Sequence, residues 1–279
     1  MKNLLRYGIL GLLLFLFIGA GMAQKVLRVV SLAPSITTTL QQLDADPIIV
    51  GRTSYCPAAL NGKPNVTVGN VLETNIEKII ALRPDLVFCM AFTKAETLEK
   101  LRKAGIKVKE YQTPKSFEEI CEQTLEIGSL CGFESKARLM VDAERKAVAT
   151  LREEFRNHPP YTAPPSVFFQ IGDNPLFPVI EGTYMNQYLS FLGLTNIVTD
   201  YKGGGISHEY VVAKQPDIIF LSLMSGLDDA AAAYWKKFES IPAVREGRIV
   251  LVDDSMACCP TPVFFRKTLE FIAAYLRKM

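Results

Sequence analysis

Two stretches of this chain repeat one pattern: residues 77–88 read EKIIALRPDLVF, and residues 209–220 read EYVVAKQPDIIF. Each begins with a glutamate, reaches a proline and continues through an aspartate into an apolar run. A glutamate favours the first turn of a helix, and a proline cannot continue one, so each stretch predicts a helix followed by a buried strand. The numbering differs by 209 − 77 = 132 at every position, which indicates one βα unit in two equivalent lobes.

Short apolar runs alternate with helical patterns along most of the chain, which is typical of parallel βα units. Strands are predicted at 26–32, 47–51, 85–90, 106–111, 166–172, 195–199, 217–223 and 248–253. Helices are predicted at 36–43, 76–82, 95–104, 116–130, 185–192, 210–214, 230–238 and 264–278. The strands are continuous apolar runs, as expected where helices cover both faces of a parallel sheet. The predicted fold class is therefore α/β, with two Rossmann-like lobes and parallel sheets.

Residues 135–157 separate the two series of elements and contain neither proline nor glycine. Apolar residues recur there at helical spacing, which predicts one helix of about 22 residues, ~33 Å long. It should end at His158, because two prolines follow. A helix is stiffer than a Gly/Ser tether. We therefore expect lobes at 24–134 and 159–279, held at a nearly fixed distance by a linking helix at 135–158, with a ligand cleft between them.

The first 23 residues have the three parts of a secretory signal peptide. Lys2 and Arg6 give the positive start, residues 9–18 form the apolar segment, and small residues lead to a predicted cleavage after Ala23. An uncleaved membrane anchor is the alternative, although the apolar run is shorter than the ~20 residues that span a bilayer. Cleavage leaves 31 − 2 = 29 basic residues and 29 acidic ones, so the mature chain has no basic surplus for binding nucleic acid.

An exported chain brings its cysteines into an oxidising compartment. None of the six forms a CxxC pair, so neither a zinc site nor a thioredoxin-type site is indicated. Cys121 and Cys131 lie on one predicted helix, roughly 15 Å apart, which is too far for a direct disulfide. Cys89 ends a buried strand. Cys56, Cys258 and Cys259 fall in loops, and a disulfide among them is left open.

No catalytic arrangement is recognisable in the sequence. The chain has only two histidines, His158 and His208, and it contains no Ser/His/Asp arrangement, HExxH motif or Walker motif. We therefore predict no catalytic residues, no metal site and no permanently bound cofactor. An exported enzyme of the chelatase or corrinoid-modifying type stays the alternative from another class, since two α/β lobes also build such enzymes.

The repeated glutamates have two interpretations. Each could simply stabilise the start of its helix, and Thr74 with Glu77 has the spacing of a capping box. Taken together, Glu77 and Glu209 should lie at symmetry-related corners on one side of a duplicated molecule. That placement suits docking onto a two-fold symmetric partner.

The chain resembles the helical-backbone class of periplasmic substrate-binding proteins of ABC importers, which take up cobalamin, ferric siderophores and haem, and it is most similar to the cobalamin-binding members. The resemblance spans the mature chain. The segments that carry it are RVVSLAPSITTTL (28–40), IIVGRTSYCP (48–57), NIEKIIALRPDLVF (75–88), LRKAGIKV (101–108), VFFQIGDNPLF (167–177) and HEYVVAKQPDIIF (208–220).

The resemblance implies a monomer that carries a small metal chelate in the cleft and docks on a dimeric permease in the inner membrane. The docking glutamates of the family correspond to Glu77 and Glu209. Family contacts come from loops at the carboxyl ends of the strands, the usual ligand position in open α/β sheets. The predicted ligand-binding residues are Pro34, Ser35, Tyr55, Cys56, Val71, Phe92, Asp173, Asn174, Phe177, Gly204, Ser255 and Cys259, of which Tyr55 and Phe177 would be aromatic walls.

Two departures from the family bear on the ligand. Val71 stands near where close cobalamin binders place a tryptophan, and Cys259 stands where the family often has an arginine. The missing arginine favours a neutral ligand such as a corrinoid over an anionic one. A ferric siderophore and haem remain the alternatives, as does contact between Cys258 or Cys259 and a metal centre. A scavenger that hands its ligand to a surface receptor would not need the two glutamates.

Overall fold

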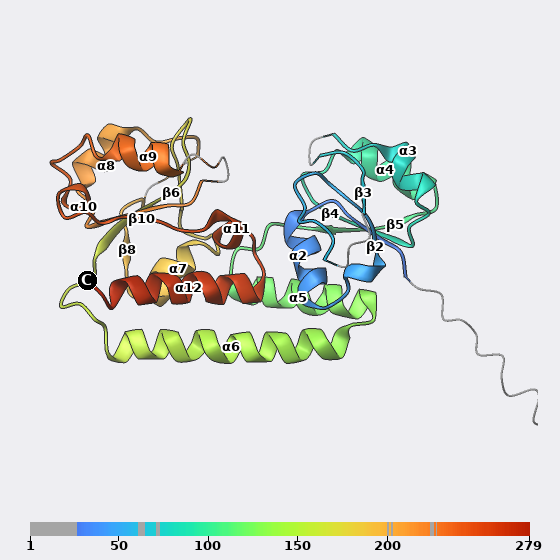
Figure 1. Ribbon diagram of the computed structural model, residues 1–279, viewed down its shortest axis with the longest axis horizontal. Coiled ribbons are helices and arrows are strands. Elements are labelled where there is room, and N and C mark those ends of the chain that lie inside the picture. Colours follow the sequence, from blue (N-terminus) through green and yellow to red (C-terminus); the bar gives the residue numbers. More distant parts are fainter. Residues whose placement is uncertain are drawn as a thin grey trace, which may run out of the picture.

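The computed structural model describes residues 27–60, 65–70, 73–199, 201, 203–223, 226 and 228–279. Two α/β lobes stand side by side above one long helix, α6 (Glu134–Asn157) (Figure 1). The helix predicted at 135–157 is thus present, and His158 is its C-terminal cap. The predicted signal peptide at 1–23 and the predicted ligand contact Val71 lie outside the described residues.

The first lobe contains a five-stranded parallel sheet. Its strands, in the order β3-β2-β1-β4-β5, are β1 (Val29–Ser31), β2 (Ile49–Arg52), β3 (Val66–Thr67), β4 (Leu86–Met90) and β5 (Lys107–Tyr111). Its helices are α2 (Pro34–Gln42), the 3-10 helix η1 (Asp46–Ile48), α3 (Ile76–Ala81), α4 (Ala95–Lys103) and α5 (Phe117–Cys131). Alternate residues of β4 join two different cores, so helices cover both faces of this sheet, as its continuous apolar strand predicts.

The second lobe is built around β6 (Ser166–Gly172), with β9 (Ile218–Leu221) and β10 (Ile249–Leu251) following on one side. The strands β8 (Thr195–Asn196) and β7 (Phe177–Pro178) pair with opposite ends of β6, and β7 runs antiparallel to it, so this sheet is mixed. Its helices are α7 (Asn186–Phe191), α8 (His208–Lys214), α9 (Asp228–Trp235), α10 (Pro242–Arg245), α11 (Asp254–Ala257) and α12 (Pro262–Leu276). Sequence analysis did not predict β3, β7, η1, α10 or α11, each of which is four residues long or shorter.

The repeated aspartates hold the same place in the two lobes. The carboxylate of Asp85 accepts a hydrogen bond from the Arg28 amide at 3.0 Å, and the Asp85 amide donates to the Arg28 carbonyl at 2.8 Å. Asp217 makes the matching pair with Ser166, at 2.8 Å and 2.9 Å. Each aspartate therefore joins the helix–strand turn of the repeat to the start of the first strand in its lobe.

The helices of the repeat also begin in the same way. The side chain of Asn75 accepts a backbone hydrogen bond at 2.8 Å at the start of α3, and Ser207 does so at 3.3 Å at the start of α8. Glu77 and Glu209 are each the second residue of their helix. Thr74 is not the cap, so the alternative capping box of Thr74 with Glu77 is not formed; the capping role belongs to the next residue.

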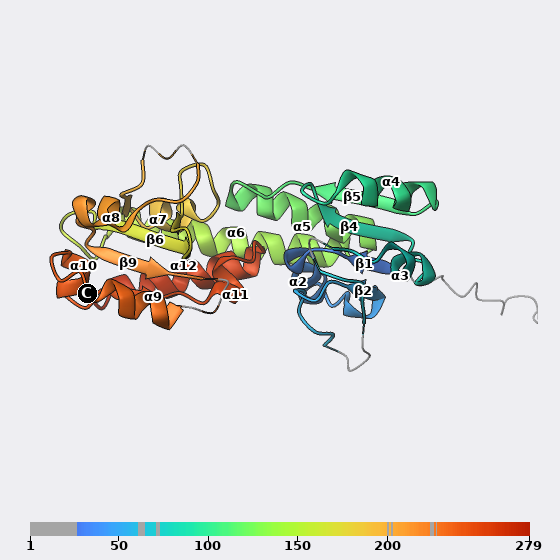
Figure 2. The ribbon, with the colours of Figure 1, turned by 90° about the horizontal axis from the view of Figure 1, so that it is seen from above.

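The lobes are related by an approximate two-fold axis. Both α3 and α8 lie on the side of the molecule away from α6 (Figure 1). Seen from above, α8 and α4 lie toward one long edge of the molecule, and α3 and α9 lie toward the other (Figure 2). A two-fold axis between the lobes exchanges α3 with α8 and α4 with α9, as the repeat in the sequence predicts.

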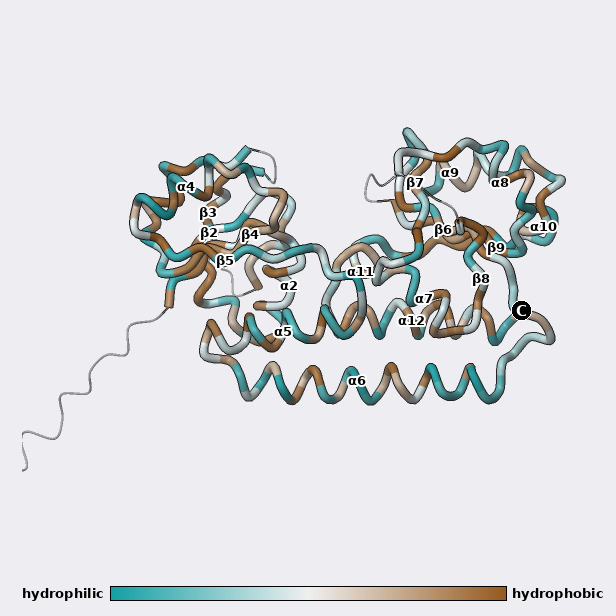
Figure 3. Tube along the Cα trace, turned by 180° about the vertical axis from the view of Figure 1, so that it is seen from behind, coloured by the Kyte–Doolittle hydropathy of each residue, from teal (hydrophilic) through white to brown (hydrophobic). Residues whose placement is uncertain are grey.

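Helix α6 does not connect the lobes alone, because α5 and α12 lie along it and share its core. Hydrophobic residues recur along α6, where Val141, Val148 and Leu151 are among the buried residues, and strands β6 and β9 are mostly hydrophobic (Figure 3). One continuous core contains Phe117 of α5, Val148 of α6, Tyr188 of α7 and Phe265 of α12. The two lobes are therefore held by a shared base of packed helices and not only by a linker.

Ion pairs across this base differ in burial. The carboxylate of Glu144, on α6, accepts a hydrogen bond from Arg266 of α12, and the side chain of Glu144 is only 11% exposed. By contrast, Arg138 and Glu134 on α6 pair at 3.0 Å with side chains that are 66% and 61% exposed. A buried carboxylate that loses its cation stays uncompensated, whereas exposed pairs contribute little.

We predict that Arg266→Ala lowers the free energy of unfolding by about 2 kcal/mol, since it leaves Glu144 without its partner in a mostly buried place. Arg138→Ala, the matched exposed control, should change it by less than about 0.5 kcal/mol. Urea unfolding followed by circular dichroism measures both. Equal effects of the two substitutions would contradict the burial argument.

Candidate functional site

The carboxyl ends of the strands bring loops of both lobes together above the helical base. Strand β1 leads directly into α2, and β10 leads into α11, and these two helices face each other at the junction (Figure 1). Cys259, just after α11, has its Sγ atom 3.6 Å from Oγ1 of Thr38 on α2. This contact joins the two lobes at the base of the junction, here called its floor. The ligand contacts predicted on these loops lie at the floor or above it.

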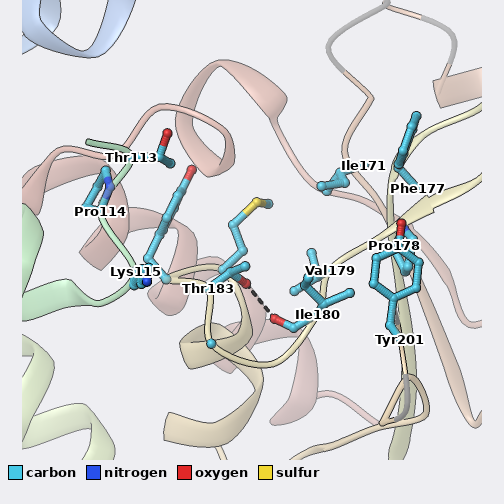
Figure 4. Close-up of a pocket in the computed structure, with 13 residues that line it drawn as sticks. Thr113, Pro114, Lys115, Ile171, Phe177, Pro178, Val179, Ile180, Thr183 and Tyr201 are labelled. Carbon is cyan, nitrogen blue, oxygen red and sulfur yellow. Dashed lines mark hydrogen bonds between the residues drawn. The ribbon is translucent and has the colours of Figure 1, made fainter. Parts of the chain in front are cut away.

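A pocket of about 540 Å³ lies at one side of this junction (Figure 4). One wall is the segment after β5, Thr113–Lys115, and the opposite wall comes from the β6–β7 hairpin and the residues leading into α7. Among the described residues, the lining is Thr113, Pro114, Lys115, Ile171, Phe177, Pro178, Val179, Ile180, Gly182, Thr183, Tyr184, Met185 and Tyr201. Lys115 is the one charged residue in this set, so the pocket suits a largely apolar, uncharged part of a ligand.

The walls of the pocket are held by close packing and hydrogen bonds. The ring of Phe177 lies over Gly172, where an added Cβ atom would approach it to 2.9 Å. The hydroxyl of Thr183 donates to the carbonyl of Ile180 at 2.7 Å and shapes the loop before α7 (Figure 4). Tyr184 donates to the carbonyl of Ala257 at 3.1 Å, which ties the pocket wall to α11 at the floor. The pocket is therefore preformed by the fold.

Three aromatic residues among the predicted ligand contacts, including the two predicted aromatic walls Tyr55 and Phe177, are on the surface. Tyr55 is 70% exposed, Phe92 is 61% exposed and Phe177 is 42% exposed. Each follows the carboxyl end of a strand, namely β2, β4 and β6. All three side chains are therefore accessible from solvent.

Of the eleven predicted ligand contacts that the structure describes, only Phe177 belongs to the pocket lining. Pro34 and Ser35 form the half-buried first turn of α2, Asp173, Asn174 and Ser255 are exposed, and Gly204 is in an exposed turn with φ of 83°. Unlike these residues, Cys56 is buried. It is 5% exposed, and its Sγ atom lies 3.1 Å from the hydroxyl of Thr53. Its side chain packs inside the first lobe.

Sequence reasoning missed most of the pocket. The segment Thr113–Lys115 follows the carboxyl end of β5, so the rule that selected the other loops applies to it equally. The residues before α7 gave no such signal, because no strand precedes them directly except the two-residue β7. Next to the predicted contact Gly204, a Cβ atom on Gly205 would lie 2.3 Å from Pro175, so the backbone approaches this proline closely.

All six cysteines are free thiols. Cys258 and Cys259 point to different partners, since Sγ of Cys258 lies 3.6 Å from the hydroxyl of Ser222 in the second lobe. Burial raises the pKa of Cys258 and of Cys259 to about 11. Both are therefore neutral thiols at pH 7, which are weak ligands for a metal. Within the described part of the chain, no group of three or more His, Cys, Asp or Glu residues could hold a metal ion.

Glu77 and Glu209 are both exposed at the beginnings of α3 and α8. Neither carboxylate forms a salt bridge with any residue that the structure describes. The pKa of Glu209 is lowered by hydrogen bonds from its own backbone amide and from Ser207 at the helix start. The two exposed carboxylates are therefore available to cations from outside the molecule.

No helix in the described ranges combines the length and the apolar character that crossing a bilayer requires.

Comparisons with known proteins agree on one family. The cobalamin-binding protein of Halobacterium salinarum is 27% identical over 246 residues, which cover 84% of this chain and 65% of that protein. The chain thus spans slightly less than two thirds of that relative. The crystal structure of the periplasmic vitamin B12-binding protein of Vibrio cholerae matches with a TM-score of 0.73 at 25% identity, covering 90% of this chain and 96% of that one.

A periplasmic haem-binding protein from Pseudomonas aeruginosa has the same fold, with a TM-score of 0.79 at 22% identity, over 90% of this chain and 92% of that one. The sequence pattern of the family described as periplasmic binding protein matches residues 29–256. That match covers both lobes and the long helix between them, so this chain belongs to the periplasmic binding protein family, a family of non-enzymatic binding proteins.

Proposed function

We propose that this protein binds a corrinoid, a cobalamin-like metal chelate, between its lobes and delivers it to an ABC importer in the inner membrane. The observation that carries the proposal is a pair of exposed carboxylates at the same helix position in two lobes, neither of which has an ion-pair partner among the described residues. Glu77 and Glu209 are the second residues of α3 and α8, two helices that lie on the side of the molecule away from α6 (Figure 1). A permease with two-fold symmetry could engage both at once through basic residues, and such charge pairs steer encounter and set orientation.

The ligand part of the proposal rests on the chemistry of the junction. The pocket lining is apolar apart from Lys115 and a few hydroxyl groups, and the exposed rings of Tyr55, Phe92 and Phe177 suit a large flat molecule. Cys259 stands at the floor where the family often has an arginine. These features favour a ligand without several negative charges, which supports a corrinoid over a ferric siderophore.

Haem is the second candidate, because the haem-binding protein from Pseudomonas aeruginosa shares the fold over 90% of this chain.

We further propose that the protein acts as a monomer in the periplasm after cleavage of its signal peptide behind Ala23, with lobes at 24–134 and 159–279. The ligand-binding residues are proposed as in the sequence analysis, except for Cys56, whose side chain is buried within the first lobe, and with the pocket residues added. Val71 is retained among them as a proposal only.

We expect residues 24–279 to be stabilised by cobalamin or cobinamide in a thermal shift assay. A ligand at 100 times its dissociation constant adds ~2.7 kcal/mol to the free energy of unfolding. Haem and a ferric siderophore are the comparison ligands. A response to haem alone would replace the corrinoid by haem, and no response from any of the four would contradict the binding role.

The docking role is tested by replacing Glu77 and Glu209 with alanine together. Both side chains are exposed, so ligand binding should stay within about twofold of the parent protein. Uptake of the ligand by cells that depend on this protein should be lost, because the permease no longer finds its two carboxylates. Glu73→Ala, another exposed acidic site in the first lobe, is the control. Normal uptake with both glutamates removed would favour a scavenger over an importer component.

A further inference from the structure

Strand β6 carries a buried glutamine in an otherwise apolar segment. Residues 167–169 are a valine and two phenylalanines, and these residues and Gln170 are all 0% exposed. A buried amide is costly unless hydrogen bonds satisfy it. The Oε1 atom of Gln170 accepts a hydrogen bond from the indole Nε1 of Trp235 at 2.7 Å. Since an indole N–H can only donate, Trp235 fixes the orientation of the amide and leaves its Nε2 atom to other partners.

The Nε2 atom of Gln170 reaches the start of the β6–β7 hairpin. It donates to the carbonyl of Gly172 at 3.1 Å and to Oδ1 of Asp173 at 3.3 Å. Each of its two hydrogens thus has an acceptor. One buried side chain therefore joins the indole of Trp235, on α9, to the hairpin, and we call this set of three hydrogen bonds the amide clamp.

The amide clamp spans an irregularity in the pairing of β6 with β7. Gln170 lies opposite Pro178, and Gly172 lies opposite Phe177. Ile171, between them, has no opposing residue, which is the pattern of a β-bulge. Bulges are common next to binding sites, where they re-aim side chains. The unopposed residue and both opposing residues, Phe177 and Pro178, line the pocket (Figure 4).

A purely structural role for Gln170 is the alternative, because a buried indole N–H needs an acceptor somewhere. That role would use only the Oε1 atom. The Nε2 atom is spent on the backbone just beyond the bulge, where the ring of Phe177 lies over Gly172 so closely that an added Cβ atom would approach it to 2.9 Å. The clamp therefore acts at the place where the pocket wall is most tightly packed.

We propose that Gln170 is a positioning residue of the ligand pocket: its amide, held by the indole of Trp235, fixes the bulge that places Phe177 in the pocket wall. Neither Gln170 nor Trp235 is among the described residues that line the pocket, so both act on the ligand through the wall and not by contact. This inference rests on the proposed function, because it concerns the affinity of the same site for its ligand.

Gln170→Met tests the clamp, because methionine has a similar length, donates no hydrogen bond and accepts one only weakly. Phe168→Leu is the matched control: Phe168 packs on the same indole, with ring centroids 5.6 Å apart, but takes no part in the clamp. Isothermal titration calorimetry measures the affinity for cobalamin, or for haem if the thermal shift assay selects haem. We expect it to fall about tenfold in Gln170→Met, because a loosened wall must be ordered on binding, and to stay within about twofold in Phe168→Leu.

A second measurement needs no ligand. The amide of Ile206 donates to the carbonyl of Leu176, in the turn of the hairpin, at 2.9 Å. The amide of Val252 donates to Leu221 in the core of the same lobe at 2.7 Å and serves as the reference for overall stability. Hydrogen exchange followed by NMR gives the ratio of the Ile206 rate to the Val252 rate. We expect this ratio to rise about tenfold in Gln170→Met and to stay unchanged in Phe168→Leu, because only the first variant frees the hairpin.

Equal losses of affinity in the two variants would overturn the inference, since the effect would then be one of general stability. An unchanged affinity or an unchanged exchange ratio in Gln170→Met would overturn it as well. If Gln170→Met does not fold, Trp235→Phe takes its place, because it removes the indole donor and should raise the same ratio. If the unaltered protein binds none of the ligands, the proposed function fails, and the exchange ratio alone decides whether Gln170 holds the wall.

Discussion

The arrangement of this molecule depends on the packing around Phe265 of α12. Its ring centroid lies 4.6 Å from that of Phe117 on α5 and 4.7 Å from that of Tyr188 on α7. The amide of Phe117 also donates to the side chain of Gln187 on α7 at 2.7 Å. Helix α5, which follows the last strand of the first sheet, is thus packed into the core of the second lobe. Separating the lobes would expose this core to water, at a free-energy cost that scales with the apolar area uncovered.

This joint explains why a binding site can be preformed between two lobes. One wall of the pocket, Thr113–Lys115, is separated from Phe117 by a single residue, and the opposite wall leads into α7. Both walls are therefore anchored to the same packed residues, and Tyr184 and Tyr188 both donate hydrogen bonds to the carbonyl of Ala257 beside the floor. A ligand would meet walls whose spacing changes little, so recognition by a partner would rely on small adjustments rather than on a wide hinge.

The same joint maintains the distance between the two corners that carry Glu77 and Glu209. Each lobe is internally fastened by its own aspartate, Asp85 or Asp217, which ties the repeated unit to the lobe's first strand. The two lobes thus present equivalent helix starts, although the residues that surround these starts differ. His208 in place of the aliphatic Ile76 is one such difference, and it changes the chemistry of a corner without moving its carboxylate.

The sequence by itself determined the two α/β lobes, the long helix and the paired glutamates. Those features depend on local rules: apolar periodicity, prolines that end helices, and a repeat with a constant offset of 132 residues. The helix predicted at 135–157 is observed as Glu134–Asn157, and the strand predicted at 166–172 is observed with the same bounds. Short elements such as β7 and α11 were missed because two to four residues carry too little periodic signal.

Only the tertiary structure decided which side chains meet. It buried Cys56 within the first lobe, brought Cys259 to within 3.6 Å of Thr38 across 221 residues of sequence, and assembled the pocket from loops that are distant along the chain. It also added α5 and α12 to a base that the sequence presented as one helix. The physical reason is that such contacts depend on how the elements pack. The packed surfaces come from distant parts of the chain, so local sequence patterns do not encode them.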